Sequence, residues 1–163
     1  MDNIAFSVMG LGKLGASMGA AFAKQGFDVI GVDVNERVVE LVNEGHAPVQ
    51  ETDLEETIAA NHDRLRATLS HRQAILDSDV SFVIVPTPSD DRGAFSLQYA
   101  GWAFKEIGRA LADKKDYHLV VLTSTVLPGS TRYGLLPILE QESGKVCGKD
   151  FGLCYSPEFI ALG

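Results

Sequence analysis

The chain has 163 residues, and a length of this size predicts one domain, covering residues 1–163. With 45% hydrophobic and 22% charged residues, its composition is that of an ordinary globular protein and excludes a disordered chain, a collagen repeat and a disulfide scaffold. Its formal net charge of −8 argues against nucleic acid and anionic membranes as partners, because such a composition offers little to neutralise a row of phosphates.

Short apolar runs alternate with helix-like stretches along the whole chain. The runs predict six strands, at residues 4–9, 27–33, 64–69, 80–85, 118–122 and 151–155. Between them the pattern predicts helices at residues 12–24, 36–44, 54–60, 71–77, 97–112 and 131–142. We expect Gly26 to end the first of these helices and Ser96 to cap the fifth.

The strand candidates are nearly continuous in Val, Ile, Leu and Phe, without regular alternation with polar residues. This pattern is typical of parallel strands that are covered on both faces. Strands joined through helices predict right-handed crossover units. The sequence therefore predicts an α/β fold with a doubly wound parallel sheet of about six strands, in the order 3-2-1-4-5-6.

The connection after the first strand has the pattern G-x-G-x-x-G and opens the first helix. Gly10 permits a tight turn, Gly12 lets a pyrophosphate approach the backbone, and Gly15 lets the helix pack closely on the sheet. The pyrophosphate would lie on N–H groups at the positive end of the helix dipole. The pattern predicts a Rossmann fold whose dinucleotide contacts the loop Gly10, Leu11, Gly12, Lys13, Leu14 and Gly15.

Asp33 lies at the end of the second predicted strand. A carboxylate at this position can accept hydrogen bonds from both hydroxyls of an adenosine ribose, and it would repel a 2′-phosphate. The predicted cofactor is therefore NAD rather than NADP. Arg37 has two interpretations, as a contact at the edge of the ribose or as a solvated helix residue, and the sequence leaves both open.

Three further polar clusters follow predicted strands. They are Pro86-Thr87-Pro88, Thr123-Ser124-Thr125 and Ser156-Pro157-Glu158. Ligands of an open parallel sheet bind outside the carboxyl ends of its strands, where all three clusters and the glycine loop fall. The two prolines hold Thr87 in a stiff, extended loop that suits the presentation of a hydroxyl.

Glu158 is the one carboxylate of the last cluster, and apolar Phe159 and Ile160 follow it. Partial burial there would raise the pKa of Glu158 and suit it to acid–base work. The alternative is a glutamate on a loop that faces solvent.

The remaining polar residues predict no metal site. Cys147 and Cys154 fit neither a disulfide framework nor a zinc pattern, and we expect semi-buried thiols in a reducing compartment. The four histidines share no spacing and receive no role, and Asp90 and Asp91 fit a solvated loop. The sequence contains neither a signal peptide nor an apolar run of the ~20 residues that span a bilayer, so we expect a cytoplasmic protein.

Together these motifs resemble the N-terminal, NAD-binding domain of the UDP-glucose/GDP-mannose dehydrogenase family, the nucleotide-sugar 6-dehydrogenases. The resemblance covers essentially the whole chain. It is carried by the glycine loop, by residues 32–36, 85–88, 124–126 and 156–159, and by Pro48, Glu51 and Leu54.

Members of that family oxidise the C6 alcohol of a nucleotide sugar to a carboxylate with two NAD. The resemblance thus implies NAD and a UDP- or GDP-sugar as partners, a role in polysaccharide biosynthesis, and a full-length enzyme that is a homo-oligomer. It implies that Thr87 and Ser124 line the nicotinamide end of the cofactor, with Pro86, Pro88 and Thr125 beside them. Thr125 would also position a catalytic water, and Glu158 would be the acid–base group of thioester hydrolysis.

Three departures from the family pattern qualify this interpretation. Val38 stands where members usually carry a basic residue, and Arg37 lies one place earlier. Leu162 stands where many members carry a second glutamate. Members also continue into a connecting helix and a sugar-binding domain that supply a catalytic lysine and cysteine, so we expect residues 1–163 to be a fragment that binds NAD and is inactive alone. The alternatives are the NAD domain of a β-hydroxyacid dehydrogenase and a non-catalytic NAD-binding module.

Overall fold

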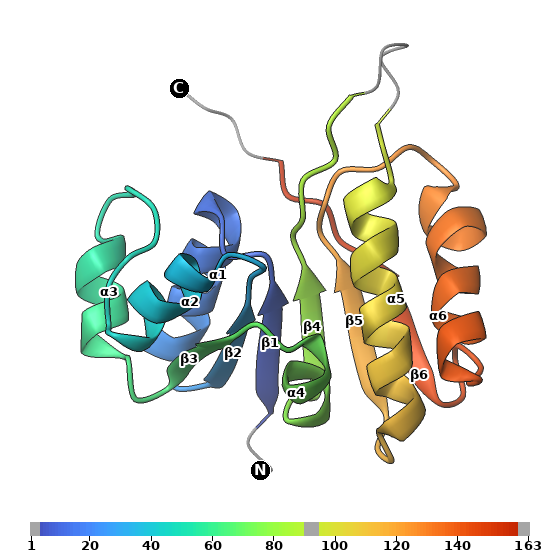
Figure 1. Ribbon diagram of the computed structural model, residues 1–163, viewed down its shortest axis with the longest axis horizontal. Helices are drawn as coiled ribbons and strands as arrows, with labels where there is room; N and C mark the ends of the chain where they lie inside the picture. The colour runs from blue at the N-terminus through green and yellow to red at the C-terminus, as the bar shows by residue number, and fades with distance from the viewer. Residues whose placement is uncertain (1–3, 90–94, 160–163) are drawn as a thin grey trace.

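Six parallel strands form the single sheet of the computed structural model, which describes residues 4–89 and 95–159 (Figure 1). Their order, β3-β2-β1-β4-β5-β6, confirms the prediction. The strands are β1 (Ala5–Met9), β2 (Asp28–Val32), β3 (Leu65–Thr68), β4 (Val80–Val83), β5 (His118–Leu122) and β6 (Phe151–Tyr155). Leu162, Asp90 and Asp91 lie outside the described residues.

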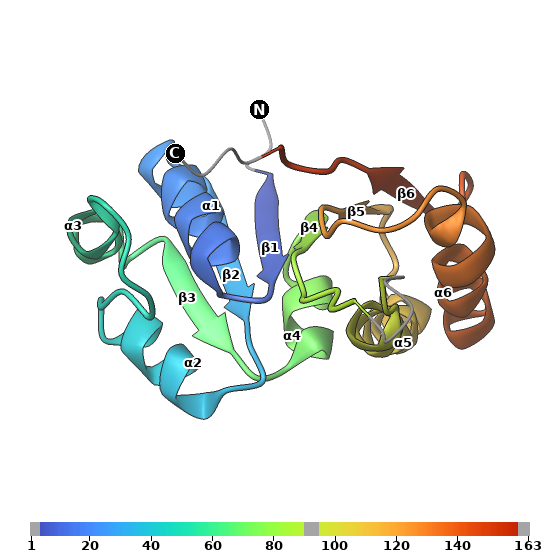
Figure 2. The same cartoon turned by 90° about the horizontal axis from the view of Figure 1, so that it is seen from above.

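Helices cover both faces of the sheet, as Figure 2 shows for α1 and α5. They are α1 (Lys13–Lys24), α2 (Glu36–Asn43), α3 (Leu54–Ala60), α4 (His71–Leu76), α5 (Gln98–Asp113), η1 (Ser130–Leu135) and α6 (Leu136–Ser143). One apolar core joins α1, α2 and α3 to the sheet, and a larger one joins α4, α5 and α6 to it. None of the helices in the described ranges is long and apolar enough to cross a membrane.

Three helix starts differ from the prediction, and the first is that of α1, which begins at Lys13 rather than at residue 12. Helix α5 begins one residue later than expected, so Leu97 is its N-cap, although the Ser96 hydroxyl still accepts a hydrogen bond from the Gln98 N–H at 3.3 Å. The helix predicted at 131–142 opens as the π-helix η1, which follows the left-handed turn at Gly129. Pro137, at the start of α6, has no N–H to continue an α-helical ladder into η1.

The turn into α3 holds a strained residue. Asp53 has a φ of 59°, and it is the one residue other than glycine with a positive φ in the described ranges. It occupies the N-cap position of α3, but its side chain makes no capping hydrogen bond there. Gly26, by contrast, ends α1 with a φ of 93°, as predicted.

A buried polar network lies near the amino ends of β1, β4 and β5. The Ser7 and Ser81 hydroxyls are 2.5 Å apart, and Ser81 Oγ lies 2.8 Å from His118 Nε2. His118 Nδ1 lies 3.0 Å from the Ser78 carbonyl, which can only accept, so Nδ1 carries the proton and Nε2 accepts from Ser81. Lys114 Nζ donates to the same carbonyl at 2.7 Å.

The burial of this network sets the charge of its histidine. His118 is fully buried, which lowers its pKa to about 4, and the nearby Lys114 ammonium lowers it in the same direction. His118 is therefore neutral at pH 7, and its two ring nitrogens are used within the fold.

Candidate functional site

The glycine loop brings β1, α1 and β4 into close contact. Gly10 has a φ of 98°, and a Cβ on it would lie 2.2 Å from the Ile84 carbonyl oxygen. A Cβ on Gly15 would lie 1.8 Å from the Gly10 carbonyl oxygen. Any side chain at either position would therefore overlap backbone atoms, so both glycines are required by the fold itself.

Gly12 lies in a different environment. A Cβ on Gly12 would meet no atom within 4 Å, so the packing of the fold does not require glycine there. Gly12 is also the N-cap of α1, and no side chain caps the helix. The loop thus leaves open space beside a helix N-terminus, which is the arrangement that receives a phosphate.

Asp33 is held in place at the end of β2 by two backbone groups. Its Oδ2 accepts from the Leu11 N–H at 2.9 Å, and its Oδ1 accepts from the Asn35 N–H at 2.9 Å. A carboxylate oxygen has room for a second hydrogen bond, so both oxygens can still accept from a ligand hydroxyl. The carboxylate is thereby oriented before any ligand arrives.

Leu11 supports this arrangement from inside the fold. Its side chain is 2% exposed and packs over Gly31 in β2, where a Cβ would lie 2.7 Å from a Leu11 methyl group. The predicted contact of Leu11 with a dinucleotide is therefore limited to its backbone, and the N–H of that backbone already donates to Asp33.

These groups line one cavity of about 480 Å³, which is within the usual size range of ligand pockets. Seven of the predicted site residues belong to its wall: Gly10, Gly12, Lys13, Leu14, Gly15, Asp33 and Pro86. An adjoining open hollow of about 600 Å³ lies between Lys13 and the polar loop 47–52. Lys13 lines both spaces, and its Nζ is 3.1 Å from Glu51 Oε1.

Three aromatic or imidazole rings in the same wall were missed by sequence reasoning. They belong to His71, Tyr99 and Trp102, on α4 and α5. His71, which received no role, packs edge-to-face on Trp102 with ring centroids 5.0 Å apart. The signal in the sequence is a pair of large aromatic residues in the first two turns of a helix that starts at the carboxyl edge of the sheet.

In the cluster Thr123-Ser124-Thr125, which follows β5, one hydroxyl forms hydrogen bonds within the fold. The Ser124 hydroxyl is buried, accepts from the Val85 N–H at 2.8 Å and donates to the Val85 carbonyl at 2.7 Å. It therefore ties the ends of β4 and β5 together. Thr125 is exposed, whereas Thr123 Oγ1 is buried without a partner among the described residues. The hydrogen-bonding capacity of the Ser124 hydroxyl is thus taken up within the fold, whereas that of the Thr123 hydroxyl is not satisfied by the described residues.

The structure contradicts the partial burial of Glu158 and matches the alternative, a glutamate on a loop that faces solvent. Glu158 is exposed, and the next residue, Phe159, is 94% exposed. The chain leaves the sheet after β6 at its carboxyl edge (Figure 1), and apolar neighbours in sequence do not cover a side chain unless another element packs over them. The expectation of two semi-buried thiols fails in the same strand, because Cys154 is exposed and only Cys147 is half-buried.

The other predicted contacts lie outside the cavity wall. Thr87 is half-buried between the exposed Pro86 and Pro88. Arg37 is exposed, and its Nη1 forms an ion pair with Glu40 Oε2 at 3.0 Å. This geometry matches the solvated interpretation of Arg37, and its contact with a ribose stays a prediction.

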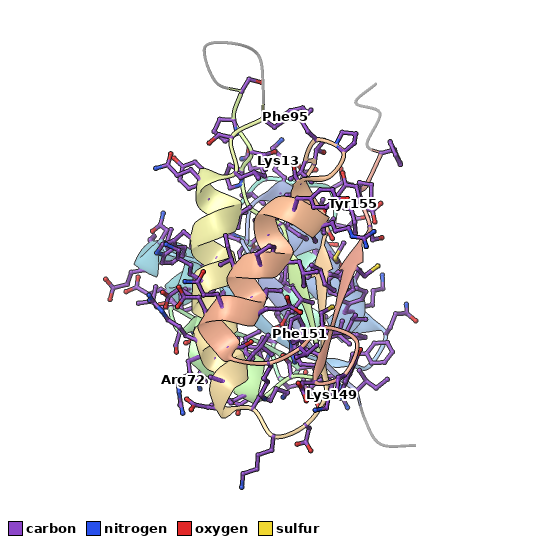
Figure 3. The ribbon with its side chains drawn as sticks, turned by 90° about the vertical axis from the view of Figure 1, so that its right-hand side faces the viewer. Lys13, Arg72, Phe95, Lys149, Phe151 and Tyr155 are labelled. Atoms are coloured by element: carbon purple, nitrogen blue, oxygen red, sulfur yellow. The ribbon has the colours of Figure 1, made fainter. Side chains whose placement is uncertain are left out.

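Viewed from the β6 side, the molecule has a carboxyl edge marked by Lys13, Phe95 and Tyr155 and an amino edge near Lys149 (Figure 3). The cavity belongs to the carboxyl edge, as the topology of parallel sheets predicts. The arrangement can hold an anion at Gly12, a diol at Asp33 and a flat apolar group against the rings.

Comparisons with known proteins agree with this geometry. Residues 4–163 match the UDP-glucose/GDP-mannose dehydrogenase family, NAD binding domain. The chain is 41% identical to the GDP-mannose 6-dehydrogenase of Pseudomonas aeruginosa and 40% identical to the UDP-glucose 6-dehydrogenase of Haloferax volcanii, over 94% and 96% of its length. It spans 36% of the length of either relative.

Solved structures give the same result. The ternary complex of GDP-mannose dehydrogenase from Pseudomonas aeruginosa superposes with a TM-score of 0.94 at 40% identity, covering 97% of this chain and 37% of that one. The UDP-glucose dehydrogenase from Pyrobaculum islandicum superposes with a TM-score of 0.88 at 34% identity, covering 97% and 36%.

Proposed function

Because the chain belongs to the UDP-glucose/GDP-mannose dehydrogenase family and corresponds to its NAD-binding domain, we propose that it is the cofactor-binding part of an enzyme that oxidises a UDP- or GDP-sugar. The observation that carries this proposal is the pairing of Asp33 with the glycine loop. Its carboxylate is fixed by the Leu11 N–H beside the open space at Gly12.

The cofactor is NAD, and the residues at the carboxyl edge fit it. The uncapped start of α1 and the space at Gly12 suit its pyrophosphate. Asp33 suits the two hydroxyls of the adenosine ribose and disfavours a 2′-phosphate. The Thr123 hydroxyl is buried and has no hydrogen-bond partner within the described part of the chain, which supports the proposal that this edge is completed by a further polar group.

When bound, NAD accepts a hydride, and oxidation of a primary alcohol to a carboxylate takes two such transfers. We assign Thr125 the positioning of a water and Glu158 the acid–base step of thioester hydrolysis, as the family resemblance implies. Both side chains are exposed at the carboxyl edge and are accessible to a substrate that approaches it. Thr87, Pro86, Pro88 and Ser124 are assigned to the nicotinamide end, with Ser124 acting by holding β4 and β5 in register.

The chain spans 36% of the length of its relatives, so the sugar site is proposed to belong to a longer protein. In that protein a lysine and a cysteine outside this chain would act on the sugar. We therefore expect the 163-residue chain to bind NAD and to form no NADH from UDP-glucose or GDP-mannose. Turnover by the chain alone would contradict the proposal that the sugar site lies outside it.

Titration of the chain with NADH and NADPH, followed by calorimetry, tests the cofactor assignment. NADH should bind at least ~10-fold more tightly, which corresponds to about 1.4 kcal/mol. The variant Asp33→Asn should lose about 1.5–3 kcal/mol of NADH binding, because charge-assisted hydrogen bonds are lost. Asp28→Asn is the matched control, since Asp28 lies at the other end of β2 and pairs with Arg64. Equal affinity for the two cofactors, or an unchanged Asp33→Asn variant, would refute the assignment.

A further inference from the structure

An aromatic wall closes the side of the cavity that faces α5, and the glycine loop and Asp33 do not account for it. Tyr99 and Trp102 lie three residues apart on α5, so both project from the same face of this helix. They are 50% and 48% exposed although they are large and mostly apolar. Exposed rings that line a formed cavity indicate a contact with a ligand.

His71 fixes the orientation of the indole. The two rings are nearly perpendicular, with an interplanar angle of 89°, and their centroids are 5.0 Å apart. His71 is itself buried, at the start of α4, and burial lowers its pKa while the charge of Glu106 opposes this shift. Trp102 is thus packed against a buried ring on one side and open to the cavity on another.

The order of groups along a dinucleotide determines what meets this wall. The ribose that binds Asp33 carries the pyrophosphate on one side and the base on the other. If the pyrophosphate lies over Gly12, at the start of α1, the base is directed away from α1. The cavity continues there past Val34 toward α4 and α5, which pack on the opposite face of the sheet from α1.

We propose that Trp102, oriented by His71 and flanked by Tyr99, forms the surface against which the adenine ring packs. A purine is flat and has π-faces, so an indole that is held in one orientation binds it by stacking or by edge contact. This inference rests on the proposed function, since it requires the ribose at Asp33. It makes Trp102 a binding residue and His71 a positioning residue.

The single tryptophan of the chain makes the contact directly observable. Its fluorescence, excited at a wavelength that adenine does not absorb, should be quenched by NAD and by ADP-ribose. Nicotinamide mononucleotide, which has no adenine, should leave the emission unchanged. Quenching by nicotinamide mononucleotide but not by ADP-ribose would place the other end of the cofactor at the wall and overturn the proposal.

Substitutions then separate the adenine contact from cofactor binding in general. By calorimetry, Trp102→Ala should bind ADP-ribose about tenfold more weakly, and Trp102→Phe should restore most of the affinity. His71→Ala should reduce the quench at saturating ADP-ribose, since the indole loses its support. Tyr117→Ala is the control, because Tyr117 is exposed on the amino side of β5 and outside the cavity.

The outcomes distinguish this inference from the proposed function. Tight NAD binding with no quench and a neutral Trp102→Ala variant would overturn the adenine contact and leave the proposed function standing. Absence of NAD binding by the folded wild-type chain would instead refute the proposed function.

Discussion

The two edges of the sheet use polar residues in opposite ways. At the amino edge, Ser7, Ser81 and His118 are fully buried and bind one another. At the carboxyl edge, Gly12 borders open space and Asp33 retains lone pairs that can accept further hydrogen bonds. Both groups of residues are polar, but Ser7, Ser81 and His118 bind one another, whereas Gly12 and Asp33 have capacity left for a ligand.

The difference shows how a binding edge can be distinguished from a structural one. A buried polar group that lacks a partner costs free energy, so a fold uses such groups internally unless a ligand completes them. His118 looks like a catalytic histidine beside a serine, yet both its ring nitrogens are already used. Free hydrogen-bonding capacity, rather than residue type, therefore marks the functional edge.

The largest expected effect comes from the glycine that the fold requires. Gly15→Ala would place a Cβ 1.8 Å from the Gly10 carbonyl oxygen, and backbone must move to relieve this overlap. We expect the free energy of unfolding, measured by urea denaturation, to fall by about 4 kcal/mol or more. A variant as stable as the wild type would mean that the loop packs less tightly than described.

The amino edge should give the next largest effect, in the form of a pH dependence. His118 has a pKa of about 4 in the folded protein against 6.5 for an unperturbed histidine. Between these two pH values the unfolded chain therefore binds more protons than the folded chain. The contribution of neutral His118 to the free energy of unfolding is thus complete above pH 6.5 and is lost as the pH falls toward 4. The loss should be about 3 kcal/mol in chemical denaturation. His118→Gln should flatten the profile relative to the wild type, and an equally steep profile would contradict this origin.

Gly12→Ala should separate binding from folding at the carboxyl edge. Nothing lies within 4 Å of the added methyl group, so stability should change by about 1 kcal/mol at most. The same methyl group fills the space intended for the pyrophosphate, and NADH affinity should fall more than ~10-fold, or about 1.4 kcal/mol. Calorimetric titration measures the affinity, with Gly15→Ala as the contrasting variant. Unchanged affinity would locate the pyrophosphate elsewhere.

The smallest expected effect is at Arg37. Its ion pair with Glu40 is exposed, and such pairs contribute little. Arg37→Ala should change both the free energy of unfolding and NADH affinity by less than about 0.5 kcal/mol. A clear loss of NADH affinity with unchanged stability would favour the ribose-edge interpretation that the sequence left open.

Much of the fold and part of the geometry of the candidate site could be predicted from the sequence, because the signals are local. Apolar runs give the strands, and the handedness of crossovers gives their order. Gly10, Gly15 and Asp33 belong to one compact motif, and the structure brings them together as expected.

The rest depends on which elements meet, and no local pattern carries that information. Trp102 and His71 come from different helices, and the Ser81–His118 contact depends on how β4 and β5 pair. The expected partial burial of Glu158 is a related case. Its neighbours in sequence are apolar, but no described element covers its side chain. Burial is a property of the tertiary environment, and it cannot be read from adjacent residues.

The left-handed residue before α3 has a consequence for engineering. Asp53 adopts a φ of 59° without a capping hydrogen bond in return, so its strain is not offset locally. Asp53→Gly should therefore raise the melting temperature slightly, corresponding to about 0.5–1 kcal/mol. Asp63→Gly is the control, and an unstabilised Asp53→Gly would show that the aspartate is tolerated for another reason. The chain thus lies below its attainable stability, at a turn that does not belong to the cavity wall, where improvement need not reduce binding.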